Sequence, residues 1–504
     1  MRPITRRDLL GGTALLSPLL LSRGEAQVSP DLVRFRPEME PLVALIEATP
    51  RERCAEMLVE QMKRGVSYRQ FLAALFLAGI RNVNPRPPGF AMHCVFVIHS
   101  AHLLSLEAPP DSRLLPLFYA LDNFKTAQDR DAKNQAGDYT MRALEGKLPD
   151  AERAASELQS AMETWDMERG ERAVAALARR RSGENVFAML WEFGARDYRN
   201  IGHKAIYAAN ASRTLHTIGW QHAEPVLRSL VLAMLDFGKQ QRVNGYGMDD
   251  QCYAANLRRV KDSFGKLHAG WAEEKGDAGA TNSIVAAIRN ATPDEACADV
   301  TERMVKGSAN AGAVWDAVHL ASAELRMRAR AGAALASVHG VTSANGLRHA
   351  FLAASDARTR FLLTLQAVGW MGQFRTASAA RPENLRPFNI TEMEPGGEVT
   401  PMSEIFAGIP GDLDAAAGRV FRMGKDLAAR QSFFTAALRH TLAKSEEVHY
   451  YKYLAALLED VPLVSPAWQP HMVASTVYYL KGAGDKDSAT MKRAREAMRG
   501  WSGA

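Results

Sequence analysis

The sequence predicts an all-α fold, a large multi-helical array of stacked helix pairs that is either solenoid-like or closed into an α/α ring. Apolar residues recur at helical spacing along most of the 504 residues, whereas the alternating pattern of a half-buried strand is nearly absent. β-Branched residues are sparse outside these helical frames. Two strings also resemble each other, Leu215–Trp220 and Leu365–Trp370, as duplicated helix pairs in such an array would.

The predicted helices can be followed along the chain. The first clear one begins at Ser67, a residue type that caps helices, and ends at residue 83 before the proline-rich turn 84–89. Residues 90–106 are apolar nearly all round, which predicts a central, buried helix. Further helices are expected at 150–181, 184–197, 201–219, 224–239, 251–264, 310–330, 343–376, 412–443, 445–460 and 470–481.

Residues 381–411, rich in proline and glycine, form the longest irregular stretch. Loops of this length are usually functional lids or linkers between lobes. Because this stretch lies far from both ends of the chain, we interpret it as an insertion or lid within a single domain, 27–504, and not as a domain boundary.

The first 26 residues resemble a twin-arginine (Tat) signal peptide. Arg6 and Arg7 precede Leu9 and a short apolar stretch that is too short to span a bilayer, and small residues up to Ala26 offer a cleavage site. An ordinary Sec signal is the alternative. We therefore expect the Tat translocase as a partner during export, and a periplasmic or secreted location. No later segment is apolar enough for a membrane span, so no stable membrane anchor is expected.

Charge and motif content exclude several function classes. A formal net charge of +6 is small for this length, and no basic block with interleaved aromatic residues occurs, so no nucleic-acid partner is expected. The P-loop, the nucleophile elbow and the dinucleotide-binding glycine motif are all absent. The cysteines lack C-x-x-C spacing and allow one or two disulfides in an oxidising compartment, without indicating which. They are Cys54, Cys94, Cys252 and Cys297.

Histidines and carboxylates three residues apart suggest a metal site. Side chains at i and i+3 of a helix point the same way, and bundle proteins use this spacing to hold two iron or manganese ions. Carboxylate and imidazole together suit iron, manganese or zinc. The alternative is that each is a surface pair or a hydrogen-bonded core histidine. The candidate ligands are His99, His102, Asp316, His319, Glu446 and His449.

Two further groups of polar residues lie within apolar helices. His203 and His349 are candidates for general acid–base catalysis, because an imidazole titrates near neutral pH. A structural hydrogen-bond network that ties helices together is the alternative. Four neighbouring side chains are candidates for substrate contacts: Tyr207, Asn210, Asn345 and Tyr453.

The string His339–His349, together with His93 and the His99-Ser-Ala-His102 segment, resembles the questin oxidase-like family. The resemblance covers roughly residues 90–450. It implies a predominantly helical protein and an oxygenase that opens an aromatic ring system in a Baeyer–Villiger-like reaction. That family's named activity uses a reduced nicotinamide cofactor, which is not expected outside the cytoplasm. The leader therefore makes a nicotinamide cofactor doubtful and favours a metal loaded before export.

Taken together, the sequence favours an exported oxidoreductase, a metal-dependent oxygenase in its most specific form, that acts on a hydrophobic or aromatic small molecule. One alternative is a non-catalytic periplasmic binding protein for an apolar ligand or haem, with haem the less favoured cofactor. The other is an α-solenoid interaction module in which the histidines are structural.

Overall fold

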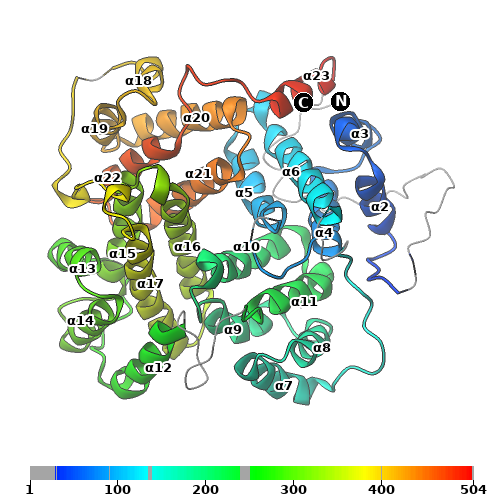
Figure 1. Ribbon diagram of the computed structural model, residues 1–504, viewed down its shortest axis with the longest axis horizontal. Coiled ribbons are helices and arrows are strands. Elements are labelled where there is room, and N and C mark those ends of the chain that lie inside the picture. Colours follow the sequence, from blue (N-terminus) through cyan, green and yellow to red (C-terminus); the bar gives the residue numbers. More distant parts are fainter. Residues whose placement is uncertain are drawn as a thin grey trace.

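The computed structural model describes residues 29, 31–89, 91–133, 139–238, 250–398 and 400–501. This part of the chain contains 22 α-helices, labelled α2 to α23, and only two isolated β-bridges, so the predicted all-α class is confirmed (Figure 1). The predicted signal peptide, 1–26, lies outside the described residues. Among the described helices, none combines the length and the hydrophobicity that a bilayer crossing requires.

The helices follow one another with short connections. Those of the first half are α2 (Glu40–Ala48), α3 (Cys54–Lys63), α4 (Tyr68–Asn82), α5 (His93–Glu107), α6 (Leu115–Ala132), α7 (Ala151–Thr164), α8 (Met167–Ala178), α9 (Gly183–Gly194), α10 (His203–Ile218), α11 (Ala223–Met234) and α12 (Gln251–Ser263). Those of the second half are α13 (Ala278–Asn290), α14 (Pro293–Lys306), α15 (Ala311–Arg328), α16 (Ala334–Ala353), α17 (Ala357–Ser378), α18 (Met402–Gly408), α19 (Leu413–Met423), α20 (Leu427–Lys444), α21 (Val448–Asp460), α22 (Gln469–Ser475) and α23 (Ala489–Ala497).

Local sequence explains where several helices begin. Ser67 and Gln70 form a capping box at the start of α4, in which each side chain accepts a hydrogen bond from the other's backbone N–H. Thr292 and Glu295 form a second capping box before α14. These reciprocal hydrogen bonds satisfy backbone donors that would otherwise lack a partner at a helix start.

Four helices from distant parts of the chain close into a ring at the centre of the molecule. α5 packs against α10, α10 against α16, α16 against α21, and α21 back against α5 (Figure 1). Contacts between helices so far apart in sequence are not the nearest-neighbour contacts of an open solenoid. α5 has almost all of its side chains buried, as the apolar run at 90–106 predicts.

Three of the predicted helices are each two helices in the structure. The 343–376 segment is interrupted at residues 354–356, where the Asp356 side chain accepts a hydrogen bond from Thr359 N and caps α17. The 150–181 segment is interrupted at Trp165, which has a left-handed backbone with φ of 62°. The 412–443 segment is interrupted between Met423 and Leu427. Local capping ends these helices although the apolar spacing continues.

The 381–411 segment contains the short helix α18 and two 3₁₀ turns, Pro382–Asn384 and Ile390–Glu392. Its buried residues Ile390 and Ile405 pack into the hydrophobic core. The segment lines neither of the two pockets described below, so its predicted role as a lid stays a prediction.

Candidate metal centre

Four buried histidines meet at the centre of the helix ring, one from each helix. His93 and His203 are the first residues of α5 and α10, and His449 is the second residue of α21. His339 lies in the second turn of α16. All four side chains are at most 4% exposed. Three of the four helices therefore direct their N-terminal ends at one point.

The Nε2 atoms of these rings converge. His203 Nε2 lies 2.9 Å from His93 Nε2 and 2.9 Å from His339 Nε2. His339 Nε2 lies 3.3 Å from His449 Nε2. Nitrogen atoms of His93, His339 and His449 all lie within 4.8 Å of one another, so a single ion could be held by them.

The outward nitrogens of two rings fix the direction of their lone pairs. His339 Nδ1 lies 2.8 Å from the carbonyl oxygen of Leu335, and His449 Nδ1 contacts the carboxylate of Glu447. A carbonyl or carboxylate only accepts hydrogen bonds, so each Nδ1 carries the proton when the ring is neutral. The two Nε2 atoms therefore present lone pairs toward each other at 3.3 Å. This is the pattern by which proteins orient histidine ligands of metals.

The electrostatics of the cluster keep the imidazoles neutral. Burial lowers the pKa of His93, His203 and His339 well below the usual value, and it also lowers the pKa of His449. The positive ends of helix dipoles at the starts of α5, α10 and α21 oppose an imidazolium in the same way. A neutral imidazole is the form that binds a metal.

Lys452, one turn after His449, adds a cationic group beside the four rings. Its charge is a second cause that lowers the pKa of His93 and His203. Burial in turn lowers the pKa of Lys452 to about 7. Its Nζ lies 5.6 Å from the centre of the Phe96 ring and has no hydrogen-bond partner among the described residues. The amine is therefore available for proton transfer near neutral pH.

An unusual backbone brings His203 to the cluster. Asn200, Ile201 and Gly202, just before α10, all have left-handed conformations, with φ of 54°, 51° and 81°. A Cβ atom at Gly202 would lie 2.2 Å from Ser343 Oγ on α16. Only glycine allows this close approach, which lets the start of α10 reach α16 near His339.

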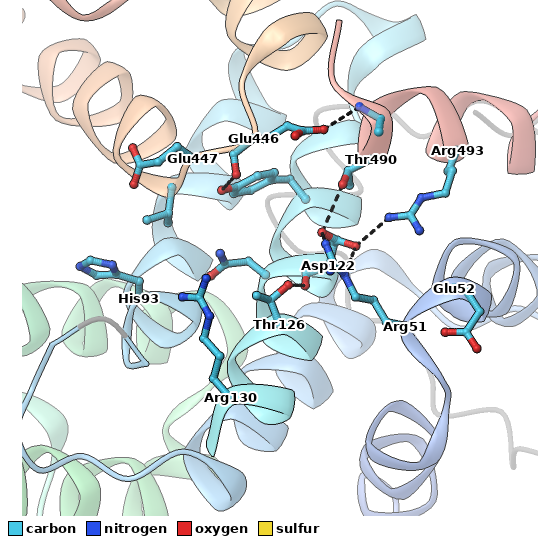
Figure 2. A pocket seen from close by; sticks show the side chains of 14 residues that line it. Arg51, Glu52, His93, Asp122, Thr126, Arg130, Glu446, Glu447, Thr490 and Arg493 are labelled. Atoms are coloured by element: carbon cyan, nitrogen blue, oxygen red, sulfur yellow. Dashed lines mark hydrogen bonds and ion pairs between the residues drawn. The ribbon is translucent and has the colours of Figure 1, made fainter. Parts of the chain in front are cut away.

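Two pockets reach the cluster from different sides. The first, of about 590 Å³, is lined by His93 and by the arginines Arg51, Arg130 and Arg493. Figure 2 shows Asp122 held by Arg51, Arg493 and Thr490 on one side of this pocket, with His93 on the opposite side. These contacts give the first pocket a polar wall.

The second pocket is larger, about 1130 Å³, and includes His449 among its lining residues. Its wall contains Tyr450 stacked on Tyr479 with ring centres 4.5 Å apart, and Lys481 Nζ lies 5.1 Å from the centre of the Tyr450 ring. Glu446 and Glu447 line both pockets, so the segment before α21 separates them.

The structure brings together two residues that sequence analysis selected, His203 and His449, but joins them to two that it did not select. His93 and His339 appear in the sequence analysis only within the strings that carry the family resemblance. Both lie in apolar helical segments, so burial was the available signal. Glu446, expected to act with His449, instead accepts a hydrogen bond from Ala489 N, and Glu447 contacts the ring.

His99 and His102 lie further along α5 and do not join the cluster. His99 Nε2 contacts Glu459 Oε1 at 2.8 Å, and His102 Nδ1 lies 3.4 Å from the hydroxyl of Tyr68. Burial lowers the pKa of His102 to about 4. Each ring therefore has a separate partner, on α21 or α4.

Asp316 and His319 belong to a second buried polar group. Asp316 Oδ1 accepts a hydrogen bond from Ser465 N at 2.9 Å. His319 Nδ1 lies 3.5 Å from Asp460 Oδ2. Burial raises the pKa of Asp460 to about 8 and lowers that of His319 to about 3. The pair is therefore neutral at pH 7, with the proton on the carboxyl group.

The remaining candidate residues have partners within the fold. His349 lies 3.4 Å from Ser212 Oγ, and Asn345 donates to Asp460 Oδ1 at 2.8 Å. The other three contacts are Tyr207 with Ser229, Asn210 with the Phe96 carbonyl, and Tyr453 with the Ser475 carbonyl. None of these five residues lines either of the two pockets.

Comparison with known proteins adds no relative: no family model, no curated protein and no solved structure matches this chain. The four-histidine cluster must therefore be interpreted from its own geometry.

Proposed function

We propose that this chain is an exported, metal-dependent oxidoreductase that acts on a hydrophobic or aromatic small molecule, with the metal held by His93, His203, His339 and His449. The observation that carries the proposal is the arrangement of His339 and His449. Their Nε2 lone pairs face each other at 3.3 Å in a buried site, an unfavourable contact unless a cation or a proton lies between them. The low pKa values disfavour the proton.

The spacing of the ring nitrogens supports one ion bound by several imidazoles. Metal–nitrogen bonds of about 2.0–2.1 Å in a tetrahedral site place neighbouring ligand nitrogens about 3.3 Å apart. The separations of 2.9, 2.9 and 3.3 Å are close to this value. Two axial haem ligands, by contrast, lie on opposite faces of a macrocycle, so this spacing favours a bare ion over haem.

The ligand type supports iron or zinc more than manganese, because imidazole suits the former and carboxylate oxygen the latter. Iron would supply one-electron and oxygen chemistry, which zinc cannot. The chain's own residues would position this ion and its substrate. Glu447 orients the ring of His449, and the Lys452 amine would accept or return a proton beside the centre.

The pockets support a small-molecule substrate. Tyr450 and Tyr479 offer an aromatic wall close to His449, against which a flat molecule could stack. Lys481 beside this wall would favour an anionic or phenolic group on such a molecule.

Elemental analysis of the full chain, purified after export through its own leader, tests the proposal. We expect about one equivalent of iron per chain, and a loss of most of that metal in His339→Ala and His93→Ala with helical circular dichroism retained. His102→Ala is the matched control, because this buried histidine lies on α5 outside the cluster. A metal-free parent chain, or equal loss in all three variants, would overturn the metal centre.

Oxygen uptake with a panel of hydroxylated aromatic compounds then tests the reaction class. Uptake that depends on the metal and disappears in His339→Ala is the expected result. A stoichiometric metal without any metal-dependent oxidation in this panel would contradict the proposed reaction and leave the metal site standing.

A further inference from the structure

Two of the four cysteines lie side by side, far from each other in sequence. Cys252 is near the start of α12 and Cys297 is in the first half of α14. Both helices pack against α17 and against each other. Cys252 is 9% exposed and Cys297 is fully buried. Both are free thiols in the structure.

The two sulfur atoms share one small space. The Asn256 side-chain nitrogen lies 3.5 Å from Cys252 Sγ and 3.7 Å from Cys297 Sγ. A Cβ atom at Gly369 on α17 would lie 2.2 Å from Cys252 Sγ and 3.2 Å from Cys297 Sγ. The missing side chain at Gly369 therefore makes the room that both sulfurs occupy.

The thiols also interact with each other. A hydrogen bond between them raises the pKa of Cys252 and lowers the pKa of Cys297. The other two cysteines show no such pairing. Cys54 Sγ faces the carbonyl oxygen of Thr49 at 3.8 Å, and burial raises the pKa of Cys94 to about 12. The structure thus distinguishes one pair among the several pairings that four cysteines allow.

We propose that Cys252 and Cys297 form a disulfide when the folded chain meets an oxidising thiol–disulfide couple. The inference is independent of the histidine cluster, which contains no thiol. Cys252, the more accessible thiol, loses its proton and attacks a sulfur of the oxidant disulfide, which releases one oxidant thiol and leaves a mixed disulfide. Cys297 then loses its proton and attacks the Cys252 sulfur, which releases the second oxidant thiol. Two electrons and two protons pass from the pair to the oxidant.

This bond would join α12 to α14 across the intervening α13. A cross-link between residues that are distant in sequence restricts the unfolded chain and so raises stability. The proposed bond would therefore make the stability of this region dependent on the redox state of the surroundings, as expected for a chain that leaves a reducing compartment.

Peptide mapping without reduction tests the bond directly. Two samples of the full chain are blocked with iodoacetamide: one isolated after export through its own leader, and one purified reduced and then incubated with oxidised glutathione. We expect a linked pair of peptides containing Cys252 and Cys297, with Cys54 and Cys94 alkylated. Alkylated thiols at both 252 and 297 in both samples would overturn the proposal, as would a different pairing.

A melting experiment gives a second test that does not depend on peptide recovery. Reduction with dithiothreitol should lower the Tm of the oxidised parent by several degrees and that of Cys54→Ser, the buried matched control, by the same amount. Cys252→Ser should show no change on reduction. An equal response in Cys252→Ser would contradict the assigned pair.

Discussion

The carboxylate of Glu447 holds both the ring and the backbone of His449. One oxygen accepts a hydrogen bond from Nδ1 of the imidazole, and the other accepts from the backbone N–H of the same residue at 3.1 Å. A single side chain therefore caps α21 and directs the His449 lone pair into the four-histidine cluster.

Replacing Glu447 should weaken metal binding without removing a ligand. For Glu447→Gln we expect metal affinity to fall about 10–100-fold, the usual effect of losing the group that orients a ligating histidine. Competition with a chromogenic chelator measures this change. Glu446→Gln is the control, since that carboxylate contacts Ala489 N instead of a histidine. Equal affinities for the two variants would contradict the assigned role.

A methyl group at Gly202 should displace His203. Gly202→Ala forces a Cβ atom into contact with Ser343 Oγ and places alanine at φ of 81°. We expect a loss of about 1–3 kcal/mol of unfolding free energy and a reduced metal content. Urea denaturation and elemental analysis measure the two effects. Gly265→Ala is the control, because a Cβ atom there meets nothing within 4 Å and the backbone φ is not left-handed.

Asp460 should make stability fall as pH rises. Burial raises its pKa to about 8, above the value of about 4 in the unfolded chain, so the native state keeps a proton that the unfolded state has released between these pH values. This group therefore costs up to about 1.4 kcal/mol per pH unit from pH 4 to pH 8. Asp460→Asn cannot titrate and should remove that slope, because it retains an acceptor for Asn345.

Unfolding free energies at pH 5 and pH 8 test this prediction. The parent should lose more stability over this interval than Asp460→Asn does. Asp129→Asn removes an exposed carboxylate and should keep the slope of the parent. The prediction fails when Asp460→Asn and Asp129→Asn show the same pH dependence.

A buried arginine should contribute far more to stability than an exposed one. Arg81 is 1% exposed and pairs with Glu40 and with Glu47, at 2.7 Å for the latter, which fixes α2 on α4. Arg81→Met leaves these carboxylates without their cation and should cost about 3 kcal/mol. Arg64→Met breaks an exposed pair with Glu60 and should change stability by less than about 1 kcal/mol. Chemical denaturation compares the two, and similar losses would contradict the prediction.

Sequence predicts helices here better than it predicts their meeting points. The start of α4 is readable because Ser67 and Gln70 act locally, and the burial of α5 is readable from its apolar run. The ends of α16 and α17 depend on one capping residue, Asp356, within an otherwise continuous apolar pattern. Local chemistry is visible in the sequence only where it is not overridden by such single residues.

The candidate site shows the same limit. The rule of i and i+3 spacing pairs Glu446 with His449, but α21 begins only at Val448, so Glu446 lies outside the helix and Glu447 reaches the ring instead. His93 and His339 could not be selected from spacing, because what brings them together is the closed contact of α5, α10, α16 and α21. Convergence of this kind is a property of tertiary packing.

The order of the ligands along the chain has a consequence for biosynthesis. Successive histidines of the cluster are separated by 110, 136 and 110 residues, and the last of them arrives with α21. An emerging polypeptide cannot complete the centre until nearly all of it has left the ribosome. Any ion that binds all four rings therefore stabilises only the finished chain, by mass action, and discriminates it from prematurely terminated products.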